Sequence, residues 1–312
     1  AVRYGRSGFR APQKCDIFRL NPGPSGECRA KCVGRAVPGT DLYRRLHAGT
    51  ALLATVWALA TAGPAAGQTI ITFDFDGSET YPTAINAGGV VTGADFYDSF
   101  EQASGFVRAA DGTITEFDGP GSYVTWAAAI NDKGSITGYY CEASCSDVWH
   151  GFLRKPGGKI ITFDVPGSTS TKPAAINDSG VITGFYDTHG FVRAADGTIT
   201  TFDPPGSTAT VPTAINAGGD IAGYYNDASS GDTLGFLRTA DGMITAFACR
   251  HKTDTEAYAI NAKDAIVGYC SSSVGSEVGF ERTRGGRIKT IVIPGATETV
   301  AVGINDKGQI AG

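Results

Sequence analysis

The sequence lacks the features that mark helical and nucleotide-binding proteins. Charged residues make up only 18% of the 312 residues, and no helical stripe of charges stands out. Glycine is abundant instead, with 43 residues, which is typical of short strands joined by many turns. A Gly-x4-Gly-Lys-Ser/Thr phosphate loop and a Gly-x-Ser-x-Gly nucleophile elbow are both absent. We therefore predict no cofactor and no catalytic residue.

The apolar run at 48–62 is too short to cross a bilayer, which needs ~20 residues. It follows Arg44 and Arg45 and precedes small residues, which is the pattern of a secretory signal cleaved before Gln68. We expect a signal peptide at 41–67, a secreted or periplasmic bacterial protein, and no stable membrane span after cleavage. An uncleaved anchor is the alternative.

Positive charge is scarce outside the N-terminal region. Residues 1–46 hold ten Lys/Arg and three Asp/Glu, whereas the rest holds 16 basic and 28 acidic residues. An acidic body does not suit nucleic acid, whose phosphates need a basic surface. Residues 1–40 lie upstream of the signal, and we interpret them as a non-native or atypical extension.

One pattern recurs through the rest of the chain. The dipeptide Ile-Asn, preceded by Ala or Gly, returns every 39–46 residues. Its isoleucines are Ile85, Ile130, Ile176, Ile215, Ile260 and Ile304. Each unit contains four strand-like segments, called strands A to D here, and strand A ends in Ile-Asn. A period near 45 residues with four strands per unit predicts an all-β fold, the β-propeller.

The turns between strands C and D carry paired residues that accept positive φ angles. These turns are Asp111-Gly112, Gly157-Gly158, Asp196-Gly197, Asp241-Gly242 and Gly285-Gly286. Such pairs favour a two-residue type I′ hairpin. Pairing outward from the first turn predicts that Phe106 lies opposite Phe117, with equivalent aromatic pairs in later units.

Two polar residues recur with the strands, and we interpret both as structural. The arginine of strand C stands at 108, 154, 193, 238 and 282. Because packing is periodic whereas a binding site is usually unique, we expect it to make hydrogen bonds or ion pairs between strands. The aspartate after strand D stands at 74, 118, 164 and 203 and is expected to cap a Pro-Gly loop.

The pattern predicts five complete blades and an incomplete sixth in a domain at 68–312, truncated at its C-terminus. Residues 69–75 read as a lone strand D, which we expect to pair near 300–312. A solenoid of β-hairpins is the alternative, because stacked hairpins also give a fixed period.

The repeat resembles the HAF-repeat family of predicted extracellular repeat proteins, named for a His-Ala-Phe triplet. The matching places are His150-Gly151-Phe152 and His189-Gly190-Phe191, while Ser104, Leu234 and Val278 replace the histidine elsewhere. The resemblance covers 69–312 and implies bacterial secretion and a propeller-like fold. The family carries no established activity, so the resemblance transfers no catalytic residue.

Variation is concentrated in the B–C loops, where the strand B glycine lies 6–13 residues before the strand C glycine. These loops are acidic and aromatic and contain no Lys or Arg. Variable loops on a rigid scaffold are where binding usually occurs. The candidate ligand-binding residues are Tyr97, Asp98, Tyr140, Asp147, Trp149, His150, Tyr186, Asp187, His189, Tyr225 and Asp227.

Three functions remain open. A secreted binding module for a glycan, a cation or a basic partner is favoured. The partner we expect for it is a carbohydrate or a cell-surface molecule. A structural surface or matrix repeat is second, and a propeller lyase or glycosidase is third. A solvated acidic rim is the bland interpretation of the B–C loops. The Asn-Asp-x-Gly turns between strands A and B hold too few carboxylates for a calcium loop, and no metal site is predicted.

The last prediction concerns cysteine. Export into an oxidising compartment favours disulfides, and the four cysteines after the signal allow three pairings. Cys141 and Cys145 share one B–C loop. Cys249 and Cys270 fall at the same end of adjacent units. We predict the pairs Cys141–Cys145 and Cys249–Cys270, with zinc binding by the four thiols as the alternative.

Overall fold

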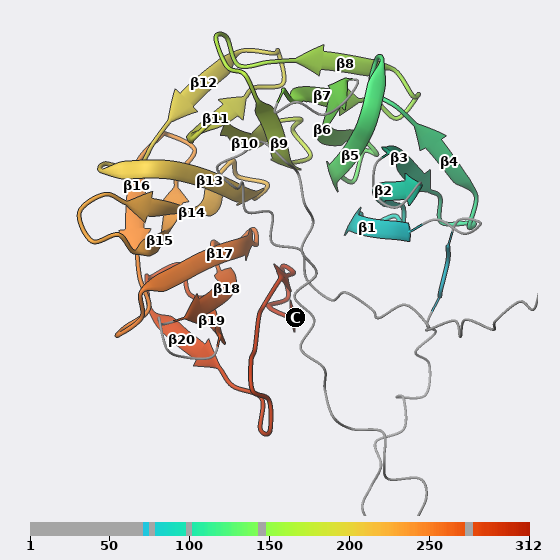
Figure 1. Ribbon diagram of the computed structural model, residues 1–312. Coiled ribbons are helices and arrows are strands. Elements are labelled where there is room, and N and C mark those ends of the chain that lie inside the picture. Colours follow the sequence, from blue (N-terminus) through green and yellow to red (C-terminus); the bar gives the residue numbers. More distant parts are fainter. Residues whose placement is uncertain (1–70, 75–78, 98–101, 143–147, 272–276) are drawn as a thin grey trace, which may run out of the picture. The chain divides into compact units, whose positions relative to one another are not determined.

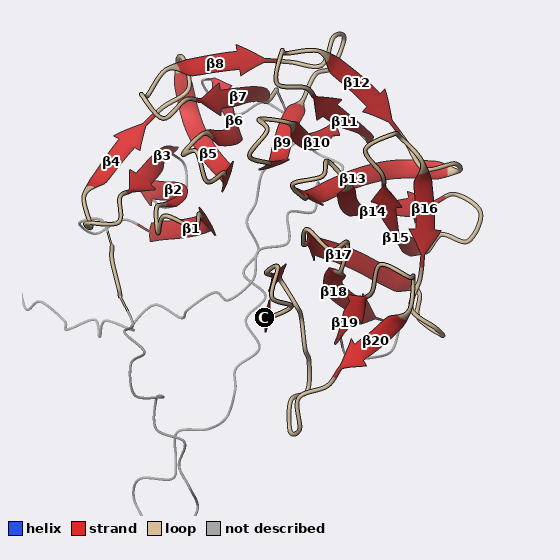
Figure 2. Cartoon of the chain, turned by 180° about the vertical axis from the view of Figure 1, so that it is seen from behind, coloured by secondary structure: helices blue, strands red, loops and turns tan. Residues whose placement is uncertain are grey.

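The computed structural model describes residues 71–74, 79–97, 102–142, 148–271 and 277–312. The chain divides into two units, Ala1–Thr72 and Phe73–Gly312, and the second contains all the described strands. The described residues form strands and loops without a helix (Figure 2), so none of them forms a membrane-crossing helix. The expected extension at 1–40 and signal at 41–67 lie outside the described residues.

Five four-stranded antiparallel units follow one another along the chain, as the repeat predicted. Blade 1 is β1 (Glu79–Ile85), β2 (Val91–Tyr97), β3 (Gln102–Arg108) and β4 (Ile114–Phe117). Blade 2 is β5 (Ser122–Ile130), β6 (Ile136–Glu142), β7 (His150–Arg154) and β8 (Ile160–Phe163). Blade 3 is β9 (Thr171–Ile176), β10 (Ile182–Tyr186), β11 (His189–Arg193) and β12 (Ile199–Phe202). Blade 4 is β13 (Ser207–Ile215), β14 (Ile221–Asp227), β15 (Thr233–Arg238) and β16 (Ile244–Phe247). Blade 5 is β17 (Asp254–Ile260), β18 (Ile266–Ser271), β19 (Val278–Arg282) and β20 (Ile288–Ile291), and the hairpin β21 (Gly303–Ile304) and β22 (Ile310–Ala311) comes after it.

Within Phe73–Gly312 the blades fan around a common centre. The first strand of each blade lies innermost and the fourth strand lies at the perimeter (Figure 1). Single parallel pairs, such as Ala103 with Val124, join the third strand of one blade to the first strand of the next. The fold is therefore a β-propeller with five complete blades and two strands of a sixth, and a linear solenoid is excluded.

The hairpin between strands C and D differs from the prediction by one residue. Gly105, not Phe106, lies opposite Phe117, and Phe106 lies opposite Glu116. The amide of Gly112 donates to Ala109 O at 2.9 Å, and Gly112 alone takes a positive φ, 93°. The loop is thus a three-residue type I turn closed by a glycine bulge, which Asp-Gly fits as well as it fits type I′.

This shifted register explains the glycine of strand C. A Cβ built on Gly105 would lie 2.7 Å from the Phe117 ring, so the ring covers a position that must stay bare. The aromatic pairs form between blades instead of within a hairpin. They are Phe73–Phe106, Phe117–Phe152, Phe163–Phe191, Phe202–Phe236 and Phe247–Phe280, edge to face with ring centroids 5.8–6.2 Å apart.

The recurring arginine is structural, as expected, but its partner is an aromatic ring. Each guanidinium carbon lies 4.7–5.0 Å from the centre of a phenylalanine ring. The ring belongs to strand D of the preceding blade or, for Arg108, to the segment 71–74. The pairs are Arg108–Phe73, Arg154–Phe117, Arg193–Phe163, Arg238–Phe202 and Arg282–Phe247. Stacking of this kind contributes about 0.5–2 kcal/mol each, so every blade is fixed to its neighbour at the perimeter.

A ladder of asparagines fixes the blades near the centre. The Nδ2 atom of each of the first five Ile-Asn asparagines donates to the backbone oxygen of the next one, at 3.0–3.3 Å. The ladder runs through Asn86, Asn131, Asn177, Asn216, Asn261 and Asn305. Each Oδ1 atom accepts the amide four residues later and so closes its own turn, as in Asn131 with Ser135 at 2.9 Å. The asparagine of the Ile-Asn repeat therefore forms a hydrogen bond between neighbouring blades. This role was not predicted from the sequence.

The predicted pairing of residues 69–75 with 300–312 is not formed by the described residues. Residues 71–74 form no strand, and β21 pairs with β22. Phe73 packs on Phe106, and Asp74 accepts a 2.9 Å hydrogen bond from Thr80. This segment therefore supplies the phenylalanine that blade 1 needs from a preceding strand D.

Candidate functional site

The B–C and D–A loops lie at one end of the blades, here called the loop face. Contacts between the two kinds of loop show this directly. The amide of Asp187 donates to Ser170 O at 3.0 Å, and the amide of Ala228 donates to Gly206 O at 2.9 Å. The variable B–C loops therefore share the loop face with the D–A loops.

A hollow of about 300 Å³ opens on the loop face between blades 1 and 2. Its lining includes Tyr97, Ser104, Glu116, Asp118, Ser122 and Tyr123. Strands β2, β3 and β4 of blade 1 supply Tyr97, Ser104 and Glu116, and Asp118 directly follows β4. Strand β5 of blade 2 supplies Ser122 and Tyr123. The tyrosine rings are half-buried, while both carboxylates are exposed, so the hollow combines apolar ring surface with hydrogen-bond acceptors.

Negative charge is concentrated in this hollow. Loss of hydration raises the pKa of the Glu116 carboxyl, and the charges of Asp95 and Asp118 raise it further. Burial also raises the pKa of Tyr97, whose hydroxyl donates to Ser104. No group of three or more described His, Cys, Asp and Glu residues has the arrangement of a metal site. The carboxylates are therefore placed to accept hydrogen bonds or to attract a cationic group.

Two predicted histidines each meet a predicted tyrosine. The rings of Tyr140 and His150 are 5.3 Å apart, and His150 Nδ1 lies 2.8 Å from Asp164 Oδ2. Tyr186 and His189 repeat this arrangement in blade 3, with Asp203 as the carboxylate, 2.7 Å from Nδ1. Because two successive blades share it, the Tyr–His–Asp arrangement is best explained as a brace for the D–A loop.

The first of these braces adjoins the hollow. A Cβ built on Gly119 would lie 2.4 Å from the Tyr140 ring, so the chain directly after Asp118 rests on that ring. The structure thus connects Tyr97, Tyr140 and His150 along one stretch of the loop face.

Other predicted ligand residues are engaged in the protein itself. Asp187 accepts hydrogen bonds from the amides of Thr169 and Ser170, and Asp227 accepts them from Ser229 and Ser230. These hydrogen bonds lower the pKa of Asp227. Tyr225 is buried in the core beside Phe236, with only 5% of its surface exposed. Asp98 and Asp147 lie outside the described residues.

Trp149 belongs to a row of rings that crosses blades 1 and 2. The row runs through Tyr81, Phe96, Trp126, Tyr139 and Trp149, with neighbouring centroids 5.3–6.4 Å apart. Lys172 of blade 3 covers its last ring, with Nζ 4.7 Å from the Trp149 centroid. A cation already occupies that ring, so Trp149 serves packing between blades.

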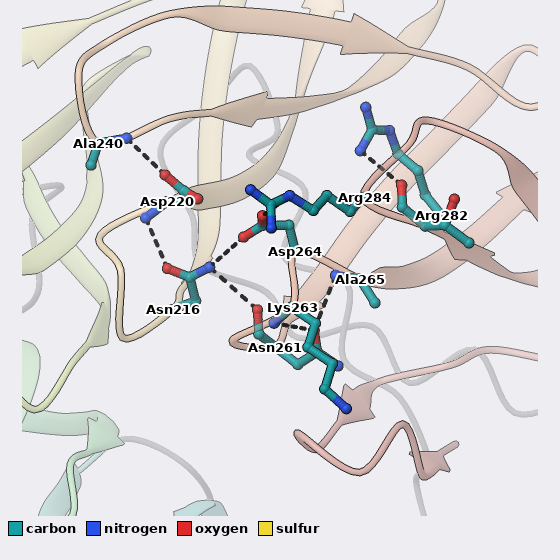
Figure 3. A network of polar contacts seen from close by, with 10 residues as sticks. Asn216, Asp220, Ala240, Asn261, Lys263, Asp264, Ala265, Arg282 and Arg284 are labelled. Atoms are coloured by element: carbon teal, nitrogen blue, oxygen red, sulfur yellow. Dashed lines mark hydrogen bonds and ion pairs between the residues drawn. The ribbon is translucent and has the colours of Figure 1, made fainter.

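The opposite end of blades 4 and 5 holds a second acidic contact (Figure 3). Asn216 Nδ2 donates to Asn261 O at 3.3 Å and to Asp264 Oδ1 at 2.9 Å. Arg284 Nε lies 3.3 Å from Asp264 Oδ2. Burial raises the pKa of Asp264, and its hydrogen bond to Asp220 and the Asp220 charge raise it further. The network ties the two blades together at a place where five other turns carry glycine.

One predicted disulfide is present. Cys249 and Cys270 are bonded, with Cα atoms 6.3 Å apart, and they join blade 4 to blade 5. Zinc binding by all four thiols is therefore wrong. Cys141 is also disulfide-bonded, but Cys145 lies outside the described residues, so that pairing stays a prediction. A disulfide is compatible with an oxidising compartment.

The residues that make the hollow acidic, Glu116 and Asp118, were not predicted as ligand-binding residues from the sequence. Glu116 had a signal, because the same position of strand D holds Thr162, Thr201, Ala246 and Thr290 in the other blades. Asp118 was interpreted only as a loop cap. Asp164 and Asp203 received the same interpretation, although they pair with histidines.

Comparisons with known proteins show the fold alone. No family model and no curated sequence matches the chain. TolB from Acinetobacter baumannii is 11% identical over 71% of this chain and 56% of its own, with a TM-score of 0.50. A streptogramin B lyase structure is 15% identical over 72% of both chains, with a TM-score of 0.48. The fucose-specific lectin from Aleuria aurantia is 12% identical over 70% of this chain and 80% of its own, with a TM-score of 0.41.

Proposed function

We propose that this protein is a binding module whose hollow between blades 1 and 2 holds a carbohydrate. The observation that carries the proposal is the lining itself. Tyr97 and Tyr123 offer ring faces, while Glu116 and Asp118 offer exposed carboxylate oxygens around a volume of about 300 Å³. Sugars present apolar C–H faces and hydroxyl donors, which match rings and carboxylates respectively. The volume lies at the small end of ligand pockets and fits one or two sugar residues.

A structural repeat protein would not need this local charge. Scaffold contacts recur in every blade, whereas the Glu116 carboxylate occurs at its strand position only in blade 1 among the five described blades. A basic peptide is the other ligand that would fit the acidic rim, and it is an outcome of the test.

The experiment is a glycan array followed by calorimetry with the best ligand. In Glu116→Thr the threonine found in blades 2 and 3 replaces the carboxylate, so the scaffold should be retained. Loss of a charged hydrogen bond should weaken binding about tenfold or more. Glu298→Thr removes the same charge from an exposed loop residue outside the hollow and should bind like the wild type. Absence of any glycan binding, or equal loss in both variants, would refute the proposal. Preference for basic peptides would reassign the ligand.

The proposal includes export, with the HAF-repeat type of propeller as its setting and 41–67 as the signal. The disulfide supports an oxidising compartment. N-terminal sequencing of protein from the periplasm of a bacterial host should begin at Gln68, and retention of Trp57 would contradict cleavage.

A further inference from the structure

A groove of about 510 Å³ lies between blades 4 and 5 and has the opposite charge. Four cationic residues line it, and no Asp or Glu among the described residues does so. Arg250 and Lys252 come from the D–A loop of blade 4. Arg287 precedes β20, and Lys289 lies on that strand of blade 5. The groove therefore brings together two loop cations and two strand cations.

This concentration is unusual for the chain. Residues 47–312 contain 16 Lys/Arg against 28 Asp/Glu, and five of those cations are the arginines stacked on phenylalanine. Eleven remain, and four of the eleven line this groove. None of the four forms an ion pair with a described residue. The nearest carboxylate by strand pairing is Glu281, directly opposite Lys289, and it does not line the groove.

The D–A loop of blade 4, which holds Arg250 and Lys252, has the same backbone turn as the D–A loop of the preceding blade. The amide of Lys252 approaches Cys249 O at 3.3 Å, as the amide of Ser207 approaches Pro204 O at 3.1 Å in the preceding blade. His251 takes φ 61° where the other D–A turns place glycine. A non-glycine residue in this conformation costs roughly 1–2 kcal/mol, so the replacement of Pro-Gly-Ser by Arg-His-Lys does not serve stability.

The disulfide holds this loop against blade 5. Cys249 directly precedes Arg250, and its partner Cys270 lies one residue before the end of the second strand of the next blade. Both cysteines line the groove. The covalent bond thus fixes the loop cations relative to those of β20, which reduces the ordering cost of binding.

We propose that this groove binds an extended polyanion through its sulfate or phosphate groups. Arginine offers paired N–H donors to such oxyanions, and lysine adds a compact charge. Two separate pairs of cations along one groove suit a chain with repeated anionic groups better than a single small anion. The acidic hollow of blades 1 and 2 repels such a ligand, so the two sites would act independently.

The test uses the full chain with two probes, a sulfated heparin oligosaccharide and inorganic polyphosphate, and measures the dissociation constant at several salt concentrations. The variant is Arg287→Gln/Lys289→Gln. The matched control is Lys155→Gln/Lys159→Gln, which removes the same charge from the equivalent exposed hairpin of blade 2. All four substituted side chains are exposed, so folding should be unaffected.

We expect at least one probe to bind, binding to weaken with salt, and the blade 5 variant to lose about tenfold or more in affinity while the control changes little. The probe that binds more tightly identifies the anionic group. Equal losses in variant and control would mean only general electrostatic attraction, and no binding of either probe would also overturn the proposal. Glycan binding at blade 1 should be unchanged in the variant, so failure of one site is distinguishable from failure of the other.

Discussion

Removal of one rung of the asparagine ladder should measure how strongly the blades are coupled. Asn177 is buried, with 6% exposed, and its Nδ2 donates to Asn216 O at 3.1 Å. Its Oδ1 also accepts the amides of Ser179 and Val181 at 3.1 and 3.0 Å. Asn177→Ala therefore removes the two bonds within the turn and the bond between blades together.

Asn305 provides a matched control. Its Oδ1 accepts the amides of Lys307 and Gln309 at 3.1 and 2.9 Å, which is the same turn. Its Nδ2 donates to Gln309 Oε1 instead of to another blade, and the residue is exposed. Asn305→Ala should thus report the turn alone, and the difference between the two variants isolates the ladder contact in its buried setting.

The expected size follows from burial. A buried polar group left without its partner costs about 1–3 kcal/mol, and the exposed turn bonds contribute about 1 kcal/mol. Asn177→Ala should lower the free energy of unfolding by about 2–4 kcal/mol, and Asn305→Ala by about 1 kcal/mol or less. Urea titrations followed by tryptophan fluorescence, fitted with a common m-value, would measure both. Equal losses in the two variants would refute the idea that the ladder couples the blades.

Two further predictions concern blades 4 and 5. The folded state raises the pKa of Asp264, so its contribution to stability is fully present below the ordinary pKa of an aspartate and is lost as the pH rises from there through the raised pKa. Asp264→Gly relieves the φ of 59° but also removes the contacts with Asn216 and Arg284, so the net sign of its effect is not the test. Its effect on the melting temperature should be more favourable at pH 8 than at pH 4, by about 2–4 °C for each kcal/mol of difference. Calorimetry at both pH values checks this, and an equal shift at both would contradict the titration argument. Cys249→Ser/Cys270→Ser should cost about 3 kcal/mol, because it opens a loop with a sequence separation of 21. An unfolding free energy equal to that of the wild type would show that the disulfide does not stabilise the chain.

The sequence was sufficient to predict the blades because their boundaries depend on local chemistry. Glycines with positive φ at the turns and Ile-Asn at the end of strand A mark each unit. The register of the hairpin between strands C and D could not be predicted in the same way. Asp111-Gly112 suits a two-residue and a three-residue loop equally, and only packing of Phe117 over Gly105 decides between them.

That one-residue error also hid part of the candidate site. In the predicted register Phe106 lies opposite Phe117, so Glu116 is not placed opposite Phe106 as it is in the structure. The position of Glu116 beside the hollow could therefore not be predicted. The tyrosines and histidines were easier to predict, because Tyr140 and Tyr186 lie in strand B directly opposite the histidine that opens strand C. Their partners Asp164 and Asp203 follow strand D, so predicting these contacts required the register between strands C and D.

Departures from the repeat mark where this propeller has differentiated. The stacked arginines, the paired phenylalanines and the first five asparagines of the ladder all make contacts between neighbouring repeats, so these side chains serve the scaffold. Glu116 in blade 1 and the Arg-His-Lys turn after blade 4 break the pattern with charges of opposite sign. Neither change improves a scaffold contact, and the second places a histidine at positive φ. Since repeated contacts sustain the fold without them, these two substitutions are the places where selection for binding would act.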